Sequence, residues 1–243
     1  MDYDTFLRIV RYTRSLRRFK PDPVPDAEID KIIEAARWAP SGFNQQPWEF
    51  VIVKNPELRK KIYQFCTTSE VELKEMEKAR ESWQGVWVSP APGGGGGFGA
   101  APVYILLYGD TRTIEGLPMA VQCDKTHCLE VFTASLANAF AYMHIAASTL
   151  GLASQWVSVV NTPYVQCMLK DLLGIRKELE LHDMLALGYS DMQPKPKLMR
   201  EKERMVHFDY CGPQAFRTDE EVRDYIRQAI VFQSVPKVNR TEK

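Results

Sequence analysis

A long apolar segment in the middle of the chain constrains the fold more than any other feature of the sequence. The predicted helix at residues 126–151 overlaps the run LEVFTASLANAFAYMHIAASTLGL at 129–152, in which apolar side chains occupy most of the circumference of a helix. A surface helix is apolar along one stripe only, so a helix that is apolar on most sides lies in a core or in a subunit interface. The segment therefore predicts a buried helix and leaves these two locations open.

The bulk composition narrows the class of protein. The chain has 243 residues, of which 45% are hydrophobic, and this is enough apolar content for one large domain. The 31 basic and 31 acidic side chains balance, so no long-range field attracts nucleic acid or an anionic membrane surface. No segment reaches the roughly 20 uncharged apolar residues of a membrane helix. We therefore expect neither nucleic acid nor a membrane as a partner.

The cysteines and the first residues indicate a cytoplasmic protein. The five cysteines are an odd number, without the short paired spacings of a zinc site or a disulfide framework. Residues 1–20 carry charges throughout and contain no apolar stretch long enough for a signal peptide. The four histidines lack ligand spacing, so no metal is expected. His144 lies among apolar residues in the middle of the long helix, where we expect a hydrogen-bonded core histidine.

Hydrophobic periodicity predicts a chain that alternates helices with strands. The expected helices cover residues 4–13, 26–38, 56–65, 70–81, 126–151, 163–173 and 218–230. The expected strands cover residues 48–53, 103–110, 152–160 and 183–188. Asp26 is the expected N-cap of the second helix, Thr218 and Glu221 form a capping box, and Gly174 follows the end of the helix that starts at Pro163.

Two segments between the third helix and the second strand predict a mobile region. Ser69 and Glu72 have capping-box spacing, which predicts a separate, mostly charged helix from residue 70. Five consecutive glycines within residues 89–102 predict a flexible loop without regular structure. The alternative is an irregular surface loop with no gating role. The expected organisation is a single domain over 1–233, a mobile lid and glycine-rich loop over 70–100, and a polar tail over 234–243.

A short basic run after the first helix is a candidate anion site. Arg14 and Arg17 lie three residues apart with the hydroxyl of Ser15 between them, so the three groups can converge on one anion if the chain turns here. A phosphate monoester suits this set because arginine binds phosphate through two donors and serine adds a neutral one. The alternative is a solvated basic helix end that interacts with the helix dipole.

The octapeptide SGFNQQPW at residues 41–48 is a second candidate site. Ser41, Asn44 and Gln46 offer the donors and acceptors that read the edge of a heteroaromatic ring. The alternative is a helix stop at Pro40 followed by amides that bind loose backbone groups of a turn. The residues alone leave both interpretations open.

Together these segments resemble the nitroreductase-type flavoproteins, which hold FMN at a homodimer interface. The resemblance rests on TRSLRRFKPDPV, on AARWAPSGFNQQPWEFVIV after an amphipathic helix, and on APVYILLYGD. It continues through the helix ending in LGL, the NTP of residues 161–163, LLGI, and ALGY at 186–189, up to about residue 207. It implies an α+β, nitroreductase-like fold, with a central and mainly antiparallel sheet flanked by helices and with the long apolar helix at the dimer interface.

The resemblance also implies which residues bind each part of FMN. The phosphate and the ribityl chain would be held by Arg14, Ser15 and Arg17. The isoalloxazine ring would be lined by Pro40, Ser41 and Asn44 of the other subunit. The segment along the flavin would include Ser158, Val160 and Thr162, with the Thr162 hydroxyl or a backbone N–H donating to N5. A further basic contact to the phosphate is expected from Arg200, with Lys197 as the alternative.

The activity implied by the resemblance is a flavin-dependent oxidoreductase. NADH or NADPH would reduce FMN at N5, leave, and be replaced by a nitroaromatic or quinone acceptor in a ping-pong cycle. The charged segment from residue 70 resembles the lid of the halotyrosine dehalogenases, and Glu72 and Lys74 are its candidate substrate contacts. A reductive dehalogenase of halogenated aromatics is therefore the alternative enzyme. A flavin-binding module without turnover and a structural protein without flavin are the non-enzymatic alternatives.

Overall fold

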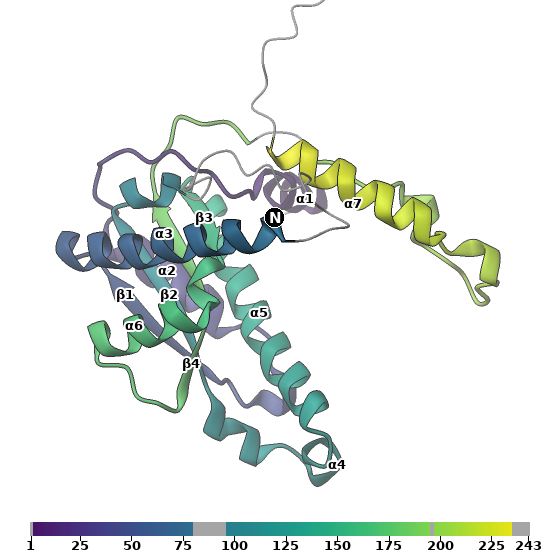
Figure 1. Ribbon diagram of the computed structural model, residues 1–243, viewed down its shortest axis with the longest axis horizontal. Helices are drawn as coiled ribbons and strands as arrows, with labels where there is room; N and C mark the ends of the chain where they lie inside the picture. The colour runs from purple at the N-terminus through teal and green to yellow at the C-terminus, as the bar shows by residue number, and fades with distance from the viewer. Residues whose placement is uncertain (1, 80–95, 195–196, 235–243) are drawn as a thin grey trace, which may run out of the picture. The chain divides into compact units, whose positions relative to one another are not determined.

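The computed structural model describes residues 2–79, 96–194 and 197–234 (Figure 1). The chain divides into two compact units. The first unit comprises Met1–Glu70 and Gly95–Pro194, and the second comprises Val71–Gly94 and Lys195–Lys243. The single domain expected over residues 1–233 stays a prediction, as does the polar tail, of which residues 235–243 lie outside the described part.

The first unit is built on one antiparallel sheet with the strand order β1-β2-β4-β3. Its strands are β1 (Trp48–Val53), β2 (Val103–Asp110), β3 (Ala153–Val157) and β4 (Leu179–Gly188). All four lie where the apolar runs predict strands, which confirms the α+β expectation. The third strand is shorter than expected because the chain turns after Val157 into a 3₁₀ helix, and the fourth is longer because its first residues are polar and hide the apolar pattern.

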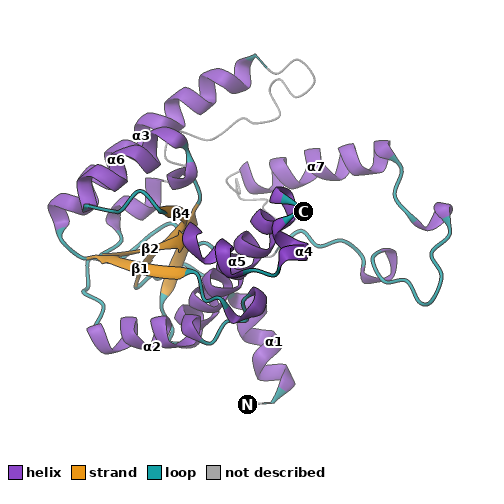
Figure 2. Cartoon of the chain, turned by 90° about the horizontal axis from the view of Figure 1, so that it is seen from below, coloured by secondary structure: helices purple, strands orange, loops and turns teal. Residues whose placement is uncertain are grey.

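Two layers of helices cover the two faces of the sheet (Figure 2). On one face, α2 and α5 pack over Ile105, Leu107 and Leu185. On the other face, α3 and α6 pack over Leu106 and Met184. The helices of the first unit are α1 (Tyr3–Tyr12), α2 (Asp26–Arg37), α3 (Pro56–Lys78, which continues into the second unit), α4 (Met119–Gln122), α5 (Lys125–Thr149) and α6 (Pro163–Leu173).

The long apolar helix α5 forms much of the first core. Its buried side chains include Phe132, Leu136, Phe140 and Met143. Leu129 on another side of the helix keeps 56% of its surface exposed. This pattern confirms a core helix, whereas the expected placement of α5 at a dimer interface stays a prediction. Among the described residues, none of the helices has the length and hydropathy of a transmembrane span.

Helix α3 corrects the expectation of two separate helices in this region. It runs without a break from Pro56 to Lys78, so Ser69 and Glu72 do not form an N-terminal capping box. The segment contains no glycine or proline after Pro56 to end a helix. Cys66 and Ser69 are buried on its inner face, and this packing favours continuation.

The end of the glycine-rich stretch is also more ordered than expected. Gly96–Ala100 form a 3₁₀ helix, whereas the sequence predicts no regular structure over residues 89–102. Phe98 supplies the reason: it is fully buried and packs edge-on against Tyr63 and Tyr104, with ring centroids 5.1 and 5.8 Å apart. The other part of the expected lid, residues 80–95, lies outside the described residues.

The helix ends test the expected caps. Gly174 adopts the left-handed conformation with φ of 65° directly after α6, as expected. The N-cap position of α2 is Pro25, so the assignment of Asp26 as N-cap is wrong. The carboxylate of Asp26 instead pairs with Lys54, and proline has the fixed φ that suits a helix entry.

The second unit contains α7 (Asp219–Ser234) and two short 3₁₀ helices, Lys202–Arg204 and Pro213–Ala215. The expected capping box opens α7: Thr218 N–H donates to the Glu221 carboxylate at 2.9 Å, and Glu221 N–H donates to the Thr218 hydroxyl at 3.3 Å. Glu221 also binds Arg204 at 2.6 Å. These contacts tie the start of α7 to the segment before it.

Candidate functional site

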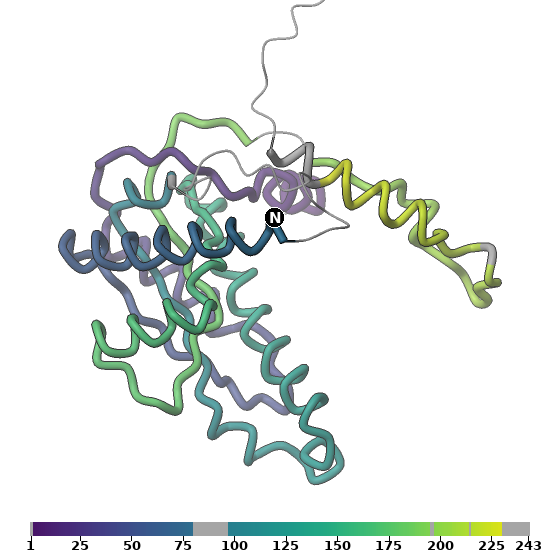
Figure 3. The backbone as a smooth tube through the Cα atoms, viewed as in Figure 1, coloured from purple at the N-terminus to yellow at the C-terminus, as the bar shows by residue number. Residues whose placement is uncertain are grey.

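The basic segment after α1 lies along the edge strand β3, and its path can be followed in Figure 3. Leu16 N–H donates to the Ser154 carbonyl at 2.9 Å, and Trp156 N–H donates to the Ser15 hydroxyl at 3.1 Å. Ser15 and Ser154 thereby form a parallel bridge. The segment is held against β3 by this bridge, which differs from the solvated helix end of the alternative interpretation.

Arg14 is a partly buried candidate phosphate ligand. Its Nη1 donates to the Thr13 carbonyl at 2.6 Å, while its Nε is buried and makes no hydrogen bond within the described part of the chain. Most buried polar groups in proteins have a partner, so this guanidinium nitrogen is an unmet hydrogen-bond donor in the described part of the chain. Arg14 also lies close enough to His144 to affect its ionisation.

His144 connects the central helix to the strand beneath the basic segment. Its Nδ1 and the Ser154 hydroxyl are 2.8 Å apart, as expected for a hydrogen-bonded core histidine. Burial, together with the positive charge of Arg14, lowers the pKa of His144 to about 4. His144 is therefore neutral at physiological pH, so Arg14 carries the positive charge of this pair.

Arg17 differs from Arg14. Its side chain is exposed, and its backbone lies in close contact with Gly97. A Cβ atom at Gly97 would lie 1.7 Å from the Arg17 carbonyl oxygen, so only glycine permits the present approach of these segments. Partial desolvation lowers the pKa of the Arg17 guanidinium. The glycine-rich stretch therefore ends in a close backbone contact with the basic segment.

The turn after α2 has an unusual backbone. Phe43, Asn44 and Gln46 have φ values of 52°, 56° and 45°, which are uncommon outside glycine. Gln46 N–H donates to the Ser41 hydroxyl at 3.1 Å, and the Gln46 amide donates to Asn44 Oδ1 at 3.0 Å. The candidate ring-binding groups thus bind the turn itself, as the alternative interpretation of this octapeptide predicts. The Asn44 side-chain nitrogen and the exposed Pro40 remain on the surface of this turn.

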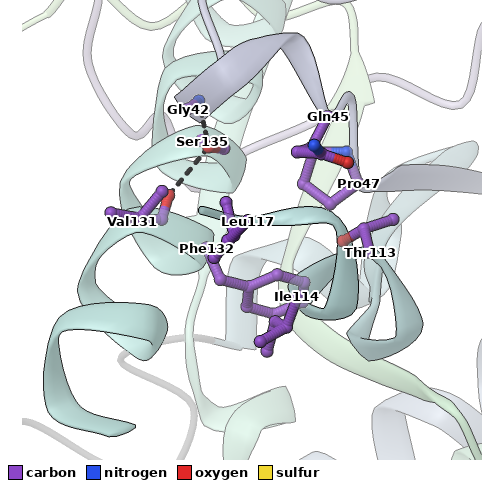
Figure 4. Close-up of a pocket in the computed structure, with 9 residues that line it drawn as sticks. All are labelled: Gly42, Gln45, Pro47, Thr113, Ile114, Leu117, Val131, Phe132 and Ser135. Carbon is purple, nitrogen blue, oxygen red and sulfur yellow. Dashed lines mark hydrogen bonds between the residues drawn. The ribbon is translucent and has the colours of Figure 1, made fainter. Parts of the chain in front are cut away.

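Two residues of α5 that the sequence did not single out hold this turn in place. Asn138 Nδ2 donates to the Pro40 carbonyl at 3.0 Å. Gly42 N–H donates to the Ser135 hydroxyl at 3.0 Å, and the Ser135 hydroxyl donates to the Val131 carbonyl at 2.8 Å. Figure 4 shows this contact beside a small pocket under the turn. Polar residues at helical spacing on an otherwise apolar helix were the available signal.

The third candidate segment follows β3. Ser158 is exposed, whereas Val160 is fully buried in the second core, so only the backbone of Val160 is available to a ligand. Thr162 lies at the start of α6, and both its N–H and its hydroxyl point to the Val159 carbonyl, at 3.2 and 3.0 Å. The Thr162 oxygen is also 3.0 Å from the buried hydroxyl of Ser69.

A buried carboxylate that the sequence did not single out supports this third segment. Asp183 on β4 keeps 4% of its surface exposed and accepts a hydrogen bond of 3.3 Å from Asn161 Nδ2. Burial raises the pKa of Asp183 to about 6, although the bonds from Trp156 and Asn161 favour its charged form. The imidazole of His182 lies 3.6 Å away, and its own pKa is lowered by burial. A bulge in the pairing of β2 with β4 explains how two adjacent residues, His182 and Asp183, are both shielded.

The remaining candidate residues belong to the second unit. Arg200 donates from Nη2 to the Arg204 carbonyl at 3.3 Å, and Lys197 is exposed. Glu72 and Lys74 lie on the last turns of α3, where Glu72 is exposed and Lys74 is half-buried. The first unit therefore contains the three segments around Arg14, Ser41 and Thr162. The candidate residues of both units stay predictions as ligands.

The chain resembles known proteins over most of its length. The model of the Nitroreductase family matches residues 10–189, which is more than half of the chain. Iodotyrosine deiodinase 1 of Rattus norvegicus is 29% identical over 193 residues, covering 76% of this chain and 61% of the rat protein. A putative NADH dehydrogenase/NAD(P)H nitroreductase of Archaeoglobus fulgidus is 23% identical over 183 residues, covering 75% of this chain and 84% of that protein.

A solved structure shares the fold. The FMN-dependent nitroreductase of Clostridium difficile R20291 superposes with a TM-score of 0.61 at 24% identity, covering 84% of this chain and 99% of the other. This likeness confirms the expected nitroreductase-like fold. The family match spans the basic segment, the turn after α2 and the segment around Thr162. The chain belongs to the nitroreductase family.

Proposed function

We propose that the chain is an FMN-dependent oxidoreductase that transfers hydride from NADH or NADPH to an electron-poor aromatic acceptor, a nitroaromatic or a quinone. The observation that carries the proposal is the buried Nε of Arg14, which makes no hydrogen bond within the described residues. Arg14 lies in a segment that also offers the Ser15 hydroxyl. This segment bonds to β3 through Ser15 and Leu16 and contacts Gly97 through the Arg17 backbone. This arrangement fits the phosphate of FMN.

The phosphate end is supported by the directions of the donors. Ser15 uses its oxygen to accept from Trp156 N–H, so its own O–H is available to donate to a phosphate oxygen. Arg14 would add a charge-assisted bond through Nε, and the exposed Arg17 would add a second. Neutral His144 behind Arg14 leaves the local charge positive, which favours a dianion. Arg200 is the proposed additional contact.

The ring end would combine groups of two copies of the chain. The left-handed turn displays Pro40, Ser41 and Asn44, and α5 holds that turn through Ser135 and Asn138. In a homodimer, this preformed corner would line the isoalloxazine ring of the partner's cofactor, while the backbone from Ser158 to Thr162 lines the ring from the same subunit. Preorganised groups of this kind bind without a large ordering cost.

Bound FMN would supply the redox chemistry by accepting a hydride at N5 and returning it to the acceptor. The chain would position the ring, present a donor from Thr162 to its N5 edge, and leave one face open to donor and acceptor in turn. Because both would use the same face, we expect ping-pong kinetics. A ternary complex with sequential kinetics would contradict this order.

A reductive dehalogenase is the second candidate activity. The relative from Rattus norvegicus is named an iodotyrosine deiodinase, and 29% identity over 193 residues favours this branch of the family. Glu72 and Lys74 on the continuation of α3 would bind the charged groups of an amino acid substrate. A flavin-binding module without turnover would share the FMN contacts and lack both activities.

One experiment separates these alternatives. The purified protein is loaded with FMN, reduced anaerobically with NADH or NADPH, and reoxidised in a stopped-flow instrument with nitroaromatics, quinones and halogenated phenols. A rate that is a hundredfold higher for one class corresponds to about 2.7 kcal/mol in the barrier and identifies the acceptor. Reoxidation no faster than that of free FMN would favour the binding module. Failure to bind FMN would contradict the proposal as a whole.

A further inference from the structure

Ser69 is a polar residue on the buried face of α3. Only 2% of its surface is exposed, and it lies on the same face of α3 as the fully buried Ile62 and Cys66. A buried hydroxyl costs free energy unless it has a hydrogen-bond partner. The partner of Ser69 is the hydroxyl of Thr162, whose oxygen is 3.0 Å from Ser69 Oγ. The bond connects residues 93 positions apart in the sequence.

The direction of this hydrogen bond follows from the second partner of Thr162. The Thr162 hydroxyl donates its one hydrogen to the Val159 carbonyl, 3.0 Å away. It can therefore only accept from Ser69, and Ser69 is the donor. The three groups form a one-way chain from Ser69 through Thr162 to Val159. A donor into Thr162 polarises its O–H bond and makes it a stronger donor in turn.

We propose that Ser69 is a positioning residue for the flavin site, which sets the direction and the donor strength of the Thr162 hydroxyl. This inference rests on the proposed function, since it concerns the donor that Thr162 would present to FMN. With one side of its oxygen occupied by Ser69, Thr162 directs its hydrogen away from α3. In this structure that hydrogen bonds the Val159 carbonyl, and the edge of a flavin bound beside the turn would be its alternative acceptor.

A purely structural role for Ser69 would make different demands. In that case the bond would satisfy one buried hydroxyl, and its loss would lower stability without changing the properties of a bound flavin. Thr67 provides a matched control on the same helix. Its hydroxyl donates only to carbonyls of α3 itself, those of Tyr63 and Gln64, both at 3.0 Å. Thr67→Val removes a hydroxyl from α3 and leaves Thr162 untouched.

The test compares Ser69→Ala, Thr162→Val, the double variant and Thr67→Val, each loaded with FMN. The readouts are the midpoint potential of the bound flavin, the Kd for FMN and the steady-state constants for the acceptor. We expect Ser69→Ala to shift the potential in the same direction as Thr162→Val and to raise the Kd about threefold, the scale of one weakened neutral hydrogen bond. The kcat should fall while the acceptor KM stays constant.

The double variant gives the sharpest result. If Ser69 acts through Thr162, the double variant has the potential and the kcat of Thr162→Val alone. The reason is that Thr162→Val already removes the hydroxyl through which Ser69 acts. Thr67→Val should keep the wild-type potential. The inference is overturned if Ser69→Ala keeps the wild-type potential and kcat, or if the two effects add in full.

The wild-type protein distinguishes this failure from that of the proposed function. A wild-type chain that binds no FMN or transfers no electrons overturns the proposed function, and the role of Ser69 falls with it. A wild-type chain that binds FMN and turns over, together with a Ser69→Ala variant that matches it in potential and kcat, overturns the role of Ser69 alone. Urea unfolding of the FMN-free variants shows that each is folded before either conclusion is drawn.

Discussion

The imidazole of His144 and the hydroxyl of Ser154 are joined by a hydrogen bond of 2.8 Å, which ties the central helix to the edge strand under the basic segment. The same serine accepts Leu16 N–H through its carbonyl, so one residue links α5 with the segment that carries Arg14. Burial holds the pKa of His144 near 4, well below its ordinary value. A neutral histidine is therefore part of the support of the candidate phosphate site.

Protonation of His144 should weaken the fold in acid. Its pKa is lower in the folded protein than in the unfolded chain, so the unfolded chain binds the proton more tightly. The stability it contributes is present above about pH 6.5 and is lost as the pH falls towards 4. Between pH 7 and pH 4, the free energy of unfolding should fall by on the order of 2 kcal/mol less in His144→Gln than in the wild type. Urea unfolding at each pH measures this difference. Equal losses in both proteins would contradict this assignment.

Asp183 should have the opposite pH dependence. Its pKa of about 6 is raised by burial, so the folded protein binds the proton more tightly than the unfolded chain does. Its contribution therefore becomes less favourable as the pH rises from about 4 to 6. We expect Asp183→Asn to be more stable than the wild type at pH 7 and to lose this advantage at pH 4. A difference in the free energy of unfolding that is constant over this range would exclude the titration of Asp183 as its cause.

The two arginine environments predict different effects on FMN binding. Removing the buried donor with Arg14→Met should raise the Kd for FMN about 10- to 100-fold, the range expected for a charge-assisted hydrogen bond. Arg18→Met is the matched control, because Arg18 is exposed in the same basic run and the family resemblance assigns it no FMN contact. Fluorescence titration with FMN measures both. An equal loss in the two variants would indicate a general charge effect instead of a specific contact.

The close approach at Gly97 predicts a large effect of one methyl group. Gly97→Ala would place Cβ against the Arg17 carbonyl oxygen, so the two segments must separate. We expect a loss of about 1 to 3 kcal/mol in the free energy of unfolding and weaker FMN binding. In Gly116→Ala, the new Cβ would meet only the flexible end of Gln45, at 2.8 Å, so this control should cost less. Similar losses in both variants would show that backbone contact at Gly97 is unimportant.

The sequence predicts the positions of the strands and of most helices because apolar runs and caps are local signals. It fails at α3, where the spacing of Ser69 and Glu72 imitates a capping box inside a continuous helix. The reason is tertiary: Ser69 is buried against Thr162, a contact between residues far apart in the sequence. A local pattern of serine and glutamate cannot distinguish a helix start from a buried hydroxyl with a distant partner.

The site shows the same limit in another form. Motifs predict which segments carry candidate ligands, yet they do not predict the residues that hold those segments. Ser135 and Asn138 hold the turn after α2, and Asp183 holds Asn161, from elements outside the motif-bearing segments. The turn amides also bind one another through left-handed backbone, which depends on packing against α5. Supporting residues of this kind become visible only when the chain is folded.

The parallel bridge between Ser15 and Ser154 has a consequence for the solution behaviour of the chain. β3 is an edge strand of the sheet, and unpaired edges recruit strands of other molecules. The segment carrying Ser15 occupies part of that edge through the bonds at Leu16 and Trp156. Removing the segment that carries Ser15 and Leu16 would therefore expose this edge to pairing with another molecule, so the candidate phosphate-binding segment also protects the chain against self-association.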